Sequence, residues 1–302
     1  INLLPLPEQK NGLVCAHFSS LDEAVRANII ALKYKPASIE MIDDYILNCT
    51  KENIEQNKNR FFVKGDPKII LMIEIFRDTI EEVKQTAEDL EKDIRGAGYG
   101  YHFPLFTEPG DIAKVWELRK AGLGVLLIIP GPKKSIQLIE DTAVLPDFFP
   151  DYIAEFQDIL KKYGLECSYY AHIATGELHL SPLLNLKDSK DVETYHNLAL
   201  DIARLVKKYR GSLSGEHGDG RLRGEFIPLM LGNHNYSILK TIKHTWDPYN
   251  VLNPGKITDT PSMVESLRYL IDEPYNTPDT TFHFPEKEGI LYAAEKCSGS
   301  GD

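Results

Sequence analysis

The sequence predicts an α+β domain, in which one antiparallel or mixed sheet carries helices on one face and is divided into two ferredoxin-like halves. Segments that read as strands and segments that read as helices alternate along the 302 residues. Several strand-like segments alternate apolar and polar side chains, which is typical of antiparallel strands with one solvated face. The strand–helix–strand order shows no strict repeat, and it permits two ferredoxin-like halves.

The first half of the chain contains the clearest elements. A helix over residues 20–34 begins with Ser20 and Glu23, which are spaced as a capping box. Asp78 and Glu81 open a second capped helix. This second helix has apolar side chains at helical spacing, at Ile80, Val83, Ala87, Leu90 and Ile94. The expected strands are 13–18, 37–43 and 68–76, followed by an extended aromatic segment over 98–106.

The second half continues the alternation of helices and strands. Apolar side chains lie on one side of each predicted helix, as they do when a helix covers a sheet. Helices are expected at 111–123, 151–163 and 190–209, a strand at 135–144, and a pair of strands within 167–183.

Composition excludes several classes of protein. The chain has 34 Lys plus Arg against 45 Asp plus Glu, a formal net charge of -11, and no basic stripe, so a nucleic-acid partner is not expected. No apolar run approaches the roughly 18 residues of a membrane-spanning helix, and no signal peptide opens the chain. The four cysteines are scattered and read as reduced thiols. We expect a cytoplasmic protein, with peripheral contact at the inner membrane face as the alternative.

The two ends of the chain read as parts of something longer. Ile1 is not a natural initiator, and the residues after about 258 are rich in Pro, Asp and Thr, as in a tail. Cys297 lies in CSGSGD, where the sequence stops. The expected organisation is one domain over 1–258, a tail or linker over 259–296, and the start of a further domain over 297–302.

A glycine-rich stretch, GSLSGEHGDGRLRGEF at residues 211–226, is the strongest functional signal. Glycine loses more backbone entropy on folding than any other residue, so a run of it indicates a sharp turn or a close approach. Glu216 could supply a metal-binding carboxylate, and His217 beside it could act as a base, since imidazole titrates near neutral pH. A solvated surface loop is the alternative, and we consider it the weaker one.

Two histidines flank a predicted hairpin in HIATGELH. If Thr175 and Gly176 form a two-residue loop, His172 faces His179 on the same side of the strand pair. With Glu216 they would form a His/His/Glu set that leaves a position open, as in catalytic sites that hold a divalent metal, most often zinc. Spacing alone favours the simpler interpretation, in which two half-exposed histidines lie on a strand pair.

A cation lies on the apolar face of the helix predicted at 111–123. Arg119 shares this face with Ile112, Val115, Trp116 and Leu123. A buried arginine needs an anionic partner, which is more commonly a protein carboxylate but can be a substrate carboxylate. Lys134 could bind the same anion, although alone it reads as a surface lysine. The turn at Asn253-Pro254-Gly255 would bring main chain close to another group.

These motifs, in this order, resemble one known family. SGEHGDGRLRGEF, HIATGELH, VWELRKAGLGVL, IEDTAV and DPYNVLNPGKI are similar to the C-terminal domain of FAD-linked oxidases, the relatives of D-lactate, glycolate and D-2-hydroxyglutarate dehydrogenases in the vanillyl-alcohol oxidase superfamily. The resemblance covers residues 13 to about 258. It implies an antiparallel sheet with helices that caps the flavin, while a separate N-terminal domain holds most of the FAD. It also implies that the CSGSGD end opens an iron–sulfur domain, with Cys297 as a cluster ligand.

The resemblance implies roles for individual residues. His172, His179 and Glu216 match divalent-metal ligands, and His217 matches the catalytic base. Arg119 and Lys134 match groups that hold the carboxylate of a small 2-hydroxy acid substrate. Glu216, Gly218, Asn253 and Gly255 match positions near the flavin cofactor. The hairpin departs from the family pattern at Thr175 and Glu177, where a carboxylate beside the metal could add a ligand or change the substrate preference.

Two other functions compete with a flavin-dependent 2-hydroxy acid dehydrogenase. A His/His/Glu site with an adjacent histidine base could also activate water, as in a metal-dependent hydrolase. Alternatively, the chain could be a non-catalytic module that binds an iron–sulfur partner. The sequence leaves the substrate, the electron acceptor and the oligomeric state open.

Overall fold

The computed structural model describes residues 9–127, 132–136, 138, 140–268, 271–272, 279–284 and 289–295. The chain divides into two compact units. The first comprises Ile1–Val125 with Tyr169–Gly176, and the second comprises Leu126–Ser168 with Glu177–Asp302. The predicted boundaries at 258 and 296 are separate from this division and stay predictions.

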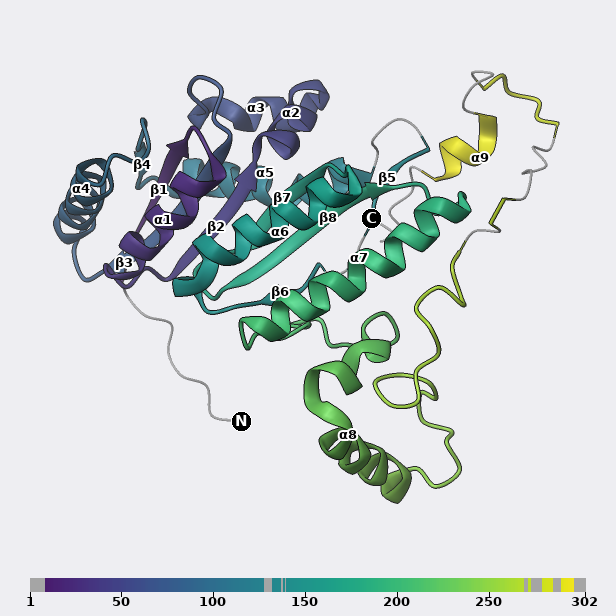
Figure 1. Cartoon of the computed structure of the whole chain (residues 1–302). Coiled ribbons are helices and arrows are strands. Elements are labelled where there is room, and N and C mark those ends of the chain that lie inside the picture. Colours follow the sequence, from purple (N-terminus) through teal and green to yellow (C-terminus); the bar gives the residue numbers. More distant parts are fainter. Residues whose placement is uncertain are drawn as a thin grey trace, which may run out of the picture. The chain divides into compact units, whose positions relative to one another are not determined.

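The first unit is built on antiparallel strands in the order β4-β1-β3-β2-β7 (Figure 1). β1 and β3 pair along their whole length, from Lys10 opposite Arg77 to Phe18 opposite Ile69. With helices α1 and α4, the order β4-β1-β3-β2 is that of a ferredoxin-like βαββαβ unit. The strands are β1 (Lys10–Phe18), β2 (Ser38–Asp43), β3 (Ile69–Arg77), β4 (Leu105–Phe106) and β7 (Cys167–His172), of which Tyr169–His172 belong to this unit.

Two capped helices cover one face of these strands. α1 (Leu21–Leu32) begins after Ser20, whose hydroxyl accepts the N–H of Glu23, as predicted. α4 (Ile80–Gly96) has a full capping box, but its members are Thr79 and Glu82. The prediction of Asp78 and Glu81 was wrong by one position, because Thr79 supplies the cap oxygen. The apolar positions expected in α4 are buried at Val83, Ala87, Leu90 and Ile94.

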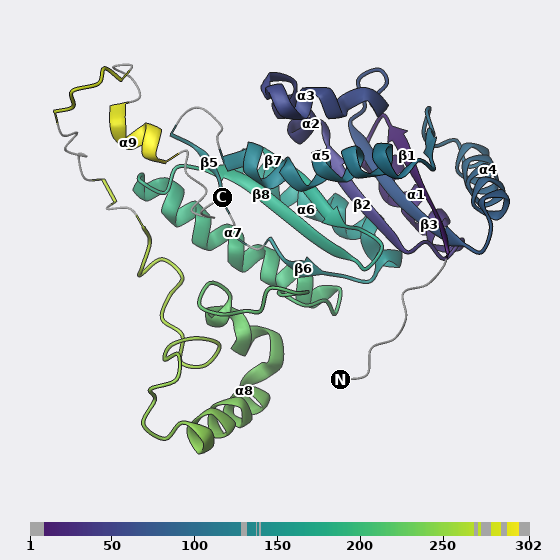
Figure 2. The same cartoon turned by 180° about the vertical axis from the view of Figure 1, so that it is seen from behind.

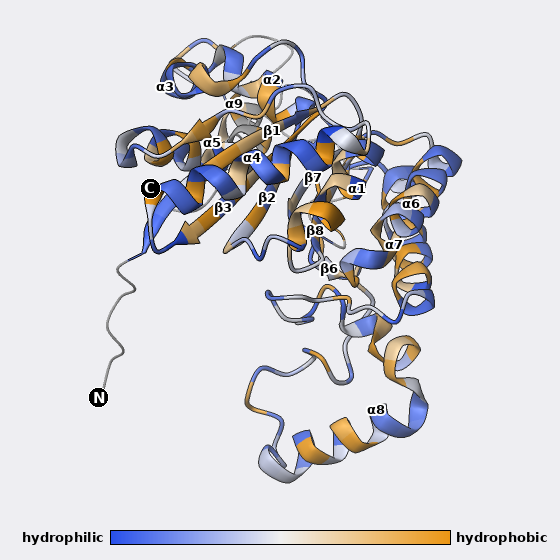
Figure 3. Ribbon diagram, turned by 90° about the vertical axis from the view of Figure 1, so that its left-hand side faces the viewer, coloured by the Kyte–Doolittle hydropathy of each residue, from blue (hydrophilic) through white to orange (hydrophobic). Residues whose placement is uncertain are grey.

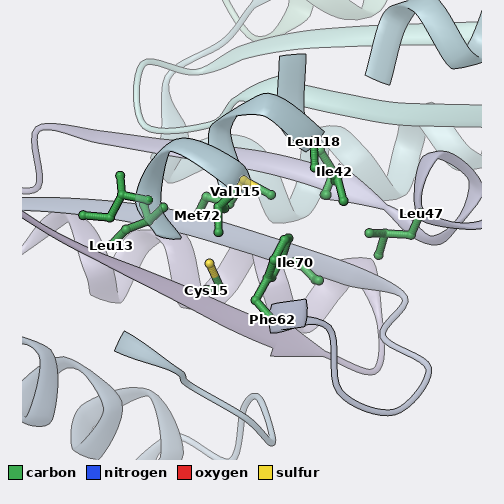
Figure 4. Close-up of a cluster of buried hydrophobic side chains, with 10 residues drawn as sticks. Leu13, Cys15, Ile42, Leu47, Phe62, Ile70, Met72, Val115 and Leu118 are labelled. Atoms are coloured by element: carbon green, nitrogen blue, oxygen red, sulfur yellow. The ribbon is translucent and has the colours of Figure 1, made fainter. Parts of the chain in front are cut away.

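The opposite face of the same strands packs against α5 (Pro109–Leu127), which the view from behind shows in front of them (Figure 2). Leu13, Cys15 and Met72 point from the strands toward Val115 of α5 (Figure 4). Leu47 of α2 (Asp44–Glu52) and Phe62 of the 3-10 helix η1 (Asn59–Phe62) belong to the same core. The sequence pattern predicted neither of these helices, nor α3 (Ile54–Lys58) between them. α5 therefore covers a second face, which the prediction did not include.

The second unit is organised around β8 (Glu177–Leu184). β5 (Lys134–Ser135) and β6 (Thr142–Ala143) both pair with it in antiparallel fashion. The single strand predicted over 135–144 is wrong, because the chain turns at Glu140 and Asp141 between these two short strands. η2 (Pro146–Phe148), α6 (Phe149–Tyr163) and α7 (Ser189–Lys208) complete the sheet-covering part, and α6 packs along α7.

The last residues of the glycine-rich stretch form η3 (Gly224–Phe226), and α8 (Ile227–Trp246) follows; the pattern predicted neither. Gly232 has φ 79° inside α8 and kinks it. Apolar and polar residues are mixed along this helix (Figure 3). The described part of the predicted tail includes α9 (Gly289–Ala294).

The antiparallel α+β class is confirmed, and the hairpin prediction is corrected. Four residues, Ile173–Gly176, separate β7 from β8 instead of two. The N–H of Thr175 bonds to the carbonyl of His172, and Gly176 takes φ 88°, which suits glycine. Thr175 therefore avoids the positive φ that a tight two-residue turn would impose.

The structure also bears on the expectations about membrane-spanning helices and about the cysteines. In the described part of the chain, no helix is both long enough and apolar enough to cross a membrane. Cys15, Cys49 and Cys167 are thiols, as expected. Cys297 lies outside the described residues.

Candidate functional site

The glycine-rich stretch is an irregular loop of the second unit that follows α7 and ends in η3. Its first residues are tied to β6, since Ser212 and Ala143 exchange main-chain hydrogen bonds of 2.8 and 2.9 Å. A Cβ atom on Gly211 would lie 2.4 Å from the carbonyl oxygen of Ala143. Only glycine permits this approach, so the sequence itself fixes where the loop leaves the sheet.

A buried carboxylate holds the middle of the loop. Asp141 is fully buried, and its two oxygens accept the N–H of Glu216 at 3.0 Å and of His217 at 2.9 Å. Ser214 donates its hydroxyl to the same carboxylate. Burial raises the pKa of Asp141, but hydrogen bonds from Glu177, Ser214 and the two N–H groups outweigh it and lower the pKa to about 2. Asp141 is therefore ionised at neutral pH.

An arginine closes the other side of the loop. Arg223 is buried and donates to Glu140 at 2.9 Å and to the carbonyl of Gly218 at 2.7 Å. Gly218 has φ 82°, and a Cβ there would meet no atom within 4 Å. Open space faces the main chain at this position, so a flat group could approach it closely. Burial raises the pKa of Asp219, the next residue, above its usual range.

His179 is oriented by the main chain of Glu140. Its Nδ1 lies 2.7 Å from the Glu140 carbonyl, which can only accept, so Nδ1 is the donor. In the neutral ring, Nε2 then carries a lone pair. This Nε2 lies 3.7 Å from a carboxylate oxygen of Glu216. A histidine whose Nδ1 hydrogen is bonded to a main-chain carbonyl, and whose Nε2 faces a carboxylate, is oriented as metal-binding histidines usually are.

Glu216 and His217 complete this cluster. Nε2 of His217 lies 3.1 Å from Glu216, and Nδ1 lies 3.4 Å from the Glu140 carboxylate. The rings of His217 and His179 stack with centroids 5.4 Å apart. Donor atoms of Asp141, Glu216 and His217 lie within 4.8 Å of one another. Imidazole nitrogens and carboxylate oxygens are zinc ligands, so His179 and Glu216 offer donors that fit a divalent cation, while the Asp141 carboxylate accepts the N–H groups of the loop.

The predicted site residues of the first unit meet at Glu40. The Glu40 carboxylate accepts a hydrogen bond from the buried Arg119 and lies 2.9 Å from Nδ1 of His172. The Arg119 guanidinium also lies 3.2 Å above the Tyr170 ring. Arg119 thus has a protein carboxylate as partner, which is the commoner of the two alternatives that the sequence left open. Ile112 and Val115 share its buried face, as predicted, and Trp116 packs partly buried against the same core.

The remaining predicted residues belong to the second unit. Lys134 is half-buried in β5. Asn253 and Gly255 lie in the turn after α8, with φ 49° and 67°. Asp247 holds this turn by accepting the N–H of Val251 and Leu252, both at 2.9 Å. The turn is bonded to the loop, because Ile257 donates to the carbonyl of Gly220 at 2.8 Å.

The structure therefore brings His179, Glu216 and His217 together within the second unit, and joins Arg119 to His172 through Glu40 within the first. The sequence analysis assigned no role to Glu140, Asp141 or Arg223, which hold the cluster. A signal was present, because two adjacent carboxylates interrupt an apolar run in SIQLIEDTAV. Buried charges of that kind require partners.

Comparison with known proteins identifies the family. Residues 7–257 match the model of the C-terminal domain of FAD linked oxidases. The chain belongs to this family, as the motifs indicated.

Several relatives share much of the chain. It is 32% identical over 275 residues to the D-2-hydroxyglutarate dehydrogenase of Pseudomonas putida, covering 88% of this chain and 27% of that protein. It is 29% identical over 266 residues to the D-2-hydroxyglutarate dehydrogenase of Escherichia coli, covering 85% and 26%. It is 25% identical over 260 residues to glycolate oxidase subunit GlcD of Bacillus subtilis, covering 85% and 53%. The chain thus spans about a quarter to a half of these relatives.

Solved structures share the fold. p-Cresol methylhydroxylase with substrate bound matches with a TM-score of 0.58 and 11% identity, over 87% of this chain and 55% of that one. The 4-ethylphenol oxidase from Gulosibacter chungangensis matches with a TM-score of 0.55 and 13% identity, over 86% and 56%. At this identity the likeness supports the fold alone.

Proposed function

We propose that this chain is the substrate-binding and catalytic cap domain of a flavin-dependent dehydrogenase that oxidises a small 2-hydroxy acid. One observation carries the proposal: His179, Glu216 and His217 converge in one loop-and-strand cluster, in which the bond from Nδ1 of His179 to the Glu140 carbonyl leaves Nε2 facing Glu216. The named activities of the relatives, on D-2-hydroxyglutarate and glycolate, support the same substrate class.

The three residues of the cluster have two different proposed roles, metal binding and proton transfer. We assign His179 and Glu216 to a divalent metal, with zinc as the proposed ion, and His217 to the base. Bound FAD would accept the hydride from Cα, and a bound divalent cation would lower the pKa of the substrate hydroxyl. His217 takes the hydroxyl proton as the Cα hydrogen leaves with its electron pair, and the product is a 2-oxo acid. The Glu140 carboxylate beside Nδ1 stabilises the resulting imidazolium.

The loop also fits the approach of a flat cofactor. Open space faces the main chain of Gly218, and the turn at Asn253 and Gly255 is bonded to the same loop. Tyr249 and Val251 in that turn are 87% and 72% exposed, which is unusual for large apolar side chains and typical of a protein interface. We propose that this surface meets an FAD-binding domain.

Other assignments rest on the family resemblance and stay predictions. They include His172 as a third metal ligand, and Lys134 and Arg119 as binders of the substrate carboxylate. An iron–sulfur domain after Cys297 is also a prediction. The hydrolase alternative gains nothing from the comparisons, since the family and its named relatives are flavin oxidases and dehydrogenases.

Flavin bleaching tests the proposal. The complete protein that contains this chain is purified anaerobically, and its flavin absorbance is recorded while D- and L-2-hydroxy acids are added one at a time. Bleaching by a 2-hydroxy acid is the expected result. A protein without flavin, or a flavin that none of the acids reduces, would contradict the proposed reaction.

A further inference from the structure

We propose that Asp141, with the main chain of Glu140, is a positioning element that sets the geometry of His179, Glu216 and His217. The inference rests on the proposed function of these three residues. It adds which residues fix the positions of their side chains. Neither Glu140 nor Asp141 needs to contact the substrate for this role.

Asp141 binds the loop as a continuous segment. Its main-chain carbonyl accepts the N–H of Gly215 at 2.7 Å, and its carboxylate accepts the N–H of Glu216 and His217. Ser214 adds its hydroxyl. Four consecutive loop residues therefore donate to one buried aspartate. The directions in which the Glu216 and His217 side chains leave the main chain follow from these bonds.

Glu140, the residue before Asp141, holds the histidine on the strand. The Glu140 carbonyl fixes the ring of His179 through Nδ1, and the Glu140 carboxylate pairs with the buried Arg223. Glu140 and Asp141 are adjacent in the chain. His179 on the strand and the loop residues Glu216 and His217 are therefore held by two neighbouring residues. A shift of either residue would change the separation of the His179 and Glu216 donor atoms, now 3.7 Å.

A purely structural role makes a different prediction from a positioning role. Asp43 provides the comparison, because it is also a buried carboxylate that accepts two main-chain N–H groups, those of Ile46 and Tyr169. Replacing either aspartate with asparagine leaves one N–H facing an amide that cannot accept it. Both changes should lower stability, but only the change at Asp141 should alter the metal affinity of the cluster.

The experiment uses the complete flavoprotein and zinc as the probe. Zinc affinity is measured by competition with a chromophoric chelator, and flavin reduction by a 2-hydroxy acid is followed at saturating acid, for the parent, Asp141→Asn and Asp43→Asn. We expect Asp141→Asn to bind zinc about 10- to 100-fold more weakly, as for other residues that orient metal ligands, and to reduce its flavin more slowly. Asp43→Asn should lower the melting temperature and keep the parent zinc affinity.

Parent affinity and parent reduction rate in Asp141→Asn would overturn the inference, as would an equal loss of zinc affinity in Asp43→Asn. If Asp141→Asn does not fold, Ser214→Ala decides, since it removes one donor to the same carboxylate: weaker zinc binding supports the inference and unchanged binding overturns it. A parent that binds no zinc and is reduced by no 2-hydroxy acid contradicts the proposed function itself, and this is seen before any variant is compared.

Discussion

Nδ1 of His179 lies 2.7 Å from the main-chain carbonyl of Glu140, and this contact decides which nitrogen of the neutral ring carries the hydrogen. Asparagine can reproduce the Nδ1 hydrogen but offers no nitrogen in the place of Nε2. We therefore expect His179→Asn to keep the bond to Glu140 and the parent melting temperature, while zinc binds at least about 10-fold more weakly. His179→Ala should lose the bond as well, at a cost of about 1 kcal/mol in the free energy of unfolding.

Chelator competition and urea unfolding of both variants check this prediction. A His179→Asn variant that binds zinc as the parent does would show that Nε2 is not a ligand. Equal unfolding free energies for the two variants would show that the contact with Glu140 contributes nothing.

Gly211 is where the loop must pass close to β6. A Cβ at this position would lie 2.4 Å from the Ala143 carbonyl oxygen, so Gly211→Ala should lower the free energy of unfolding by about 1–3 kcal/mol. Gly96→Ala is the matched control, since nothing lies within 4 Å of its Cβ position at the end of α4. That substitution should stabilise the protein by about 0.5 kcal/mol. Urea titrations measure both, and a Gly211→Ala variant as stable as the parent would contradict the close approach.

His17 gives the first unit a dependence on pH. Its Nδ1 donates to the Cys15 carbonyl at 2.8 Å, and its Nε2 accepts the N–H of Lys64 at 3.2 Å, so a second ring proton would break the latter bond. Burial is the main cause that lowers the pKa of His17 from 6.5 to about 4. Between these values the unfolded chain binds a proton that the folded chain does not. Stability is therefore full above pH 6.5 and is lost as the pH falls toward 4.

The lowered pKa of His17 changes the free energy of unfolding by about 3 kcal/mol between pH 6.5 and low pH. An NMR titration of the imidazole resonances measures it directly, and His102, whose ring lies 5.0 Å from that of His17, must be assigned at the same time. A His17 midpoint near the ordinary value of a histidine would contradict the prediction.

Arg119 is a buried cation whose removal should lower the stability of the protein strongly. Its partner Glu40 is 14% exposed, and the Arg119 side chain is 6% exposed. Arg119→Ala leaves this carboxylate buried without its guanidinium, so we expect a loss of about 3–5 kcal/mol in unfolding free energy. Arg26→Ala is the control, because Arg26 and Asp22 form an exposed pair one helical turn apart, worth less than about 1 kcal/mol. Comparable losses in the two variants would contradict the buried pair.

Sequence patterns were sufficient to predict those helices and strands whose structure depends mainly on their own residues. The buried run at 68–76 became β3, and the helical spacing from Val83 to Ile94 became α4. The cap of α4 was misplaced because Asp78 and Thr79 are both good cap residues. α8 was missed because it exposes large apolar side chains such as Ile242 and Trp246, and because Gly232 interrupts its pattern.

The sequence was sufficient to predict the reactive residues of the candidate site, but not the residues that hold them in position. Glu216 and His217 lie in a stretch whose glycines mark it, whereas Asp141 acts on them from 75 residues away. No local period encodes that contact. The prediction of one strand over 135–144 was wrong for the same reason. The carboxylates of Glu140 and Asp141 bind Arg223 and the loop, and these two residues do not pair with a neighbouring strand.

The proposed base is tested most directly by a single-turnover experiment on the complete flavoprotein. His217→Gln and the parent are mixed anaerobically with a saturating 2-hydroxy acid, and the rate of flavin reduction is measured by stopped flow. The side chain of His217 is 44% exposed and lies in a loop, so the variant should fold with the parent melting temperature. We predict a reduction rate lower by about 100- to 10,000-fold with little change in the Kd for the acid. A variant that reduces its flavin at the parent rate would contradict the assignment of catalysis to this domain.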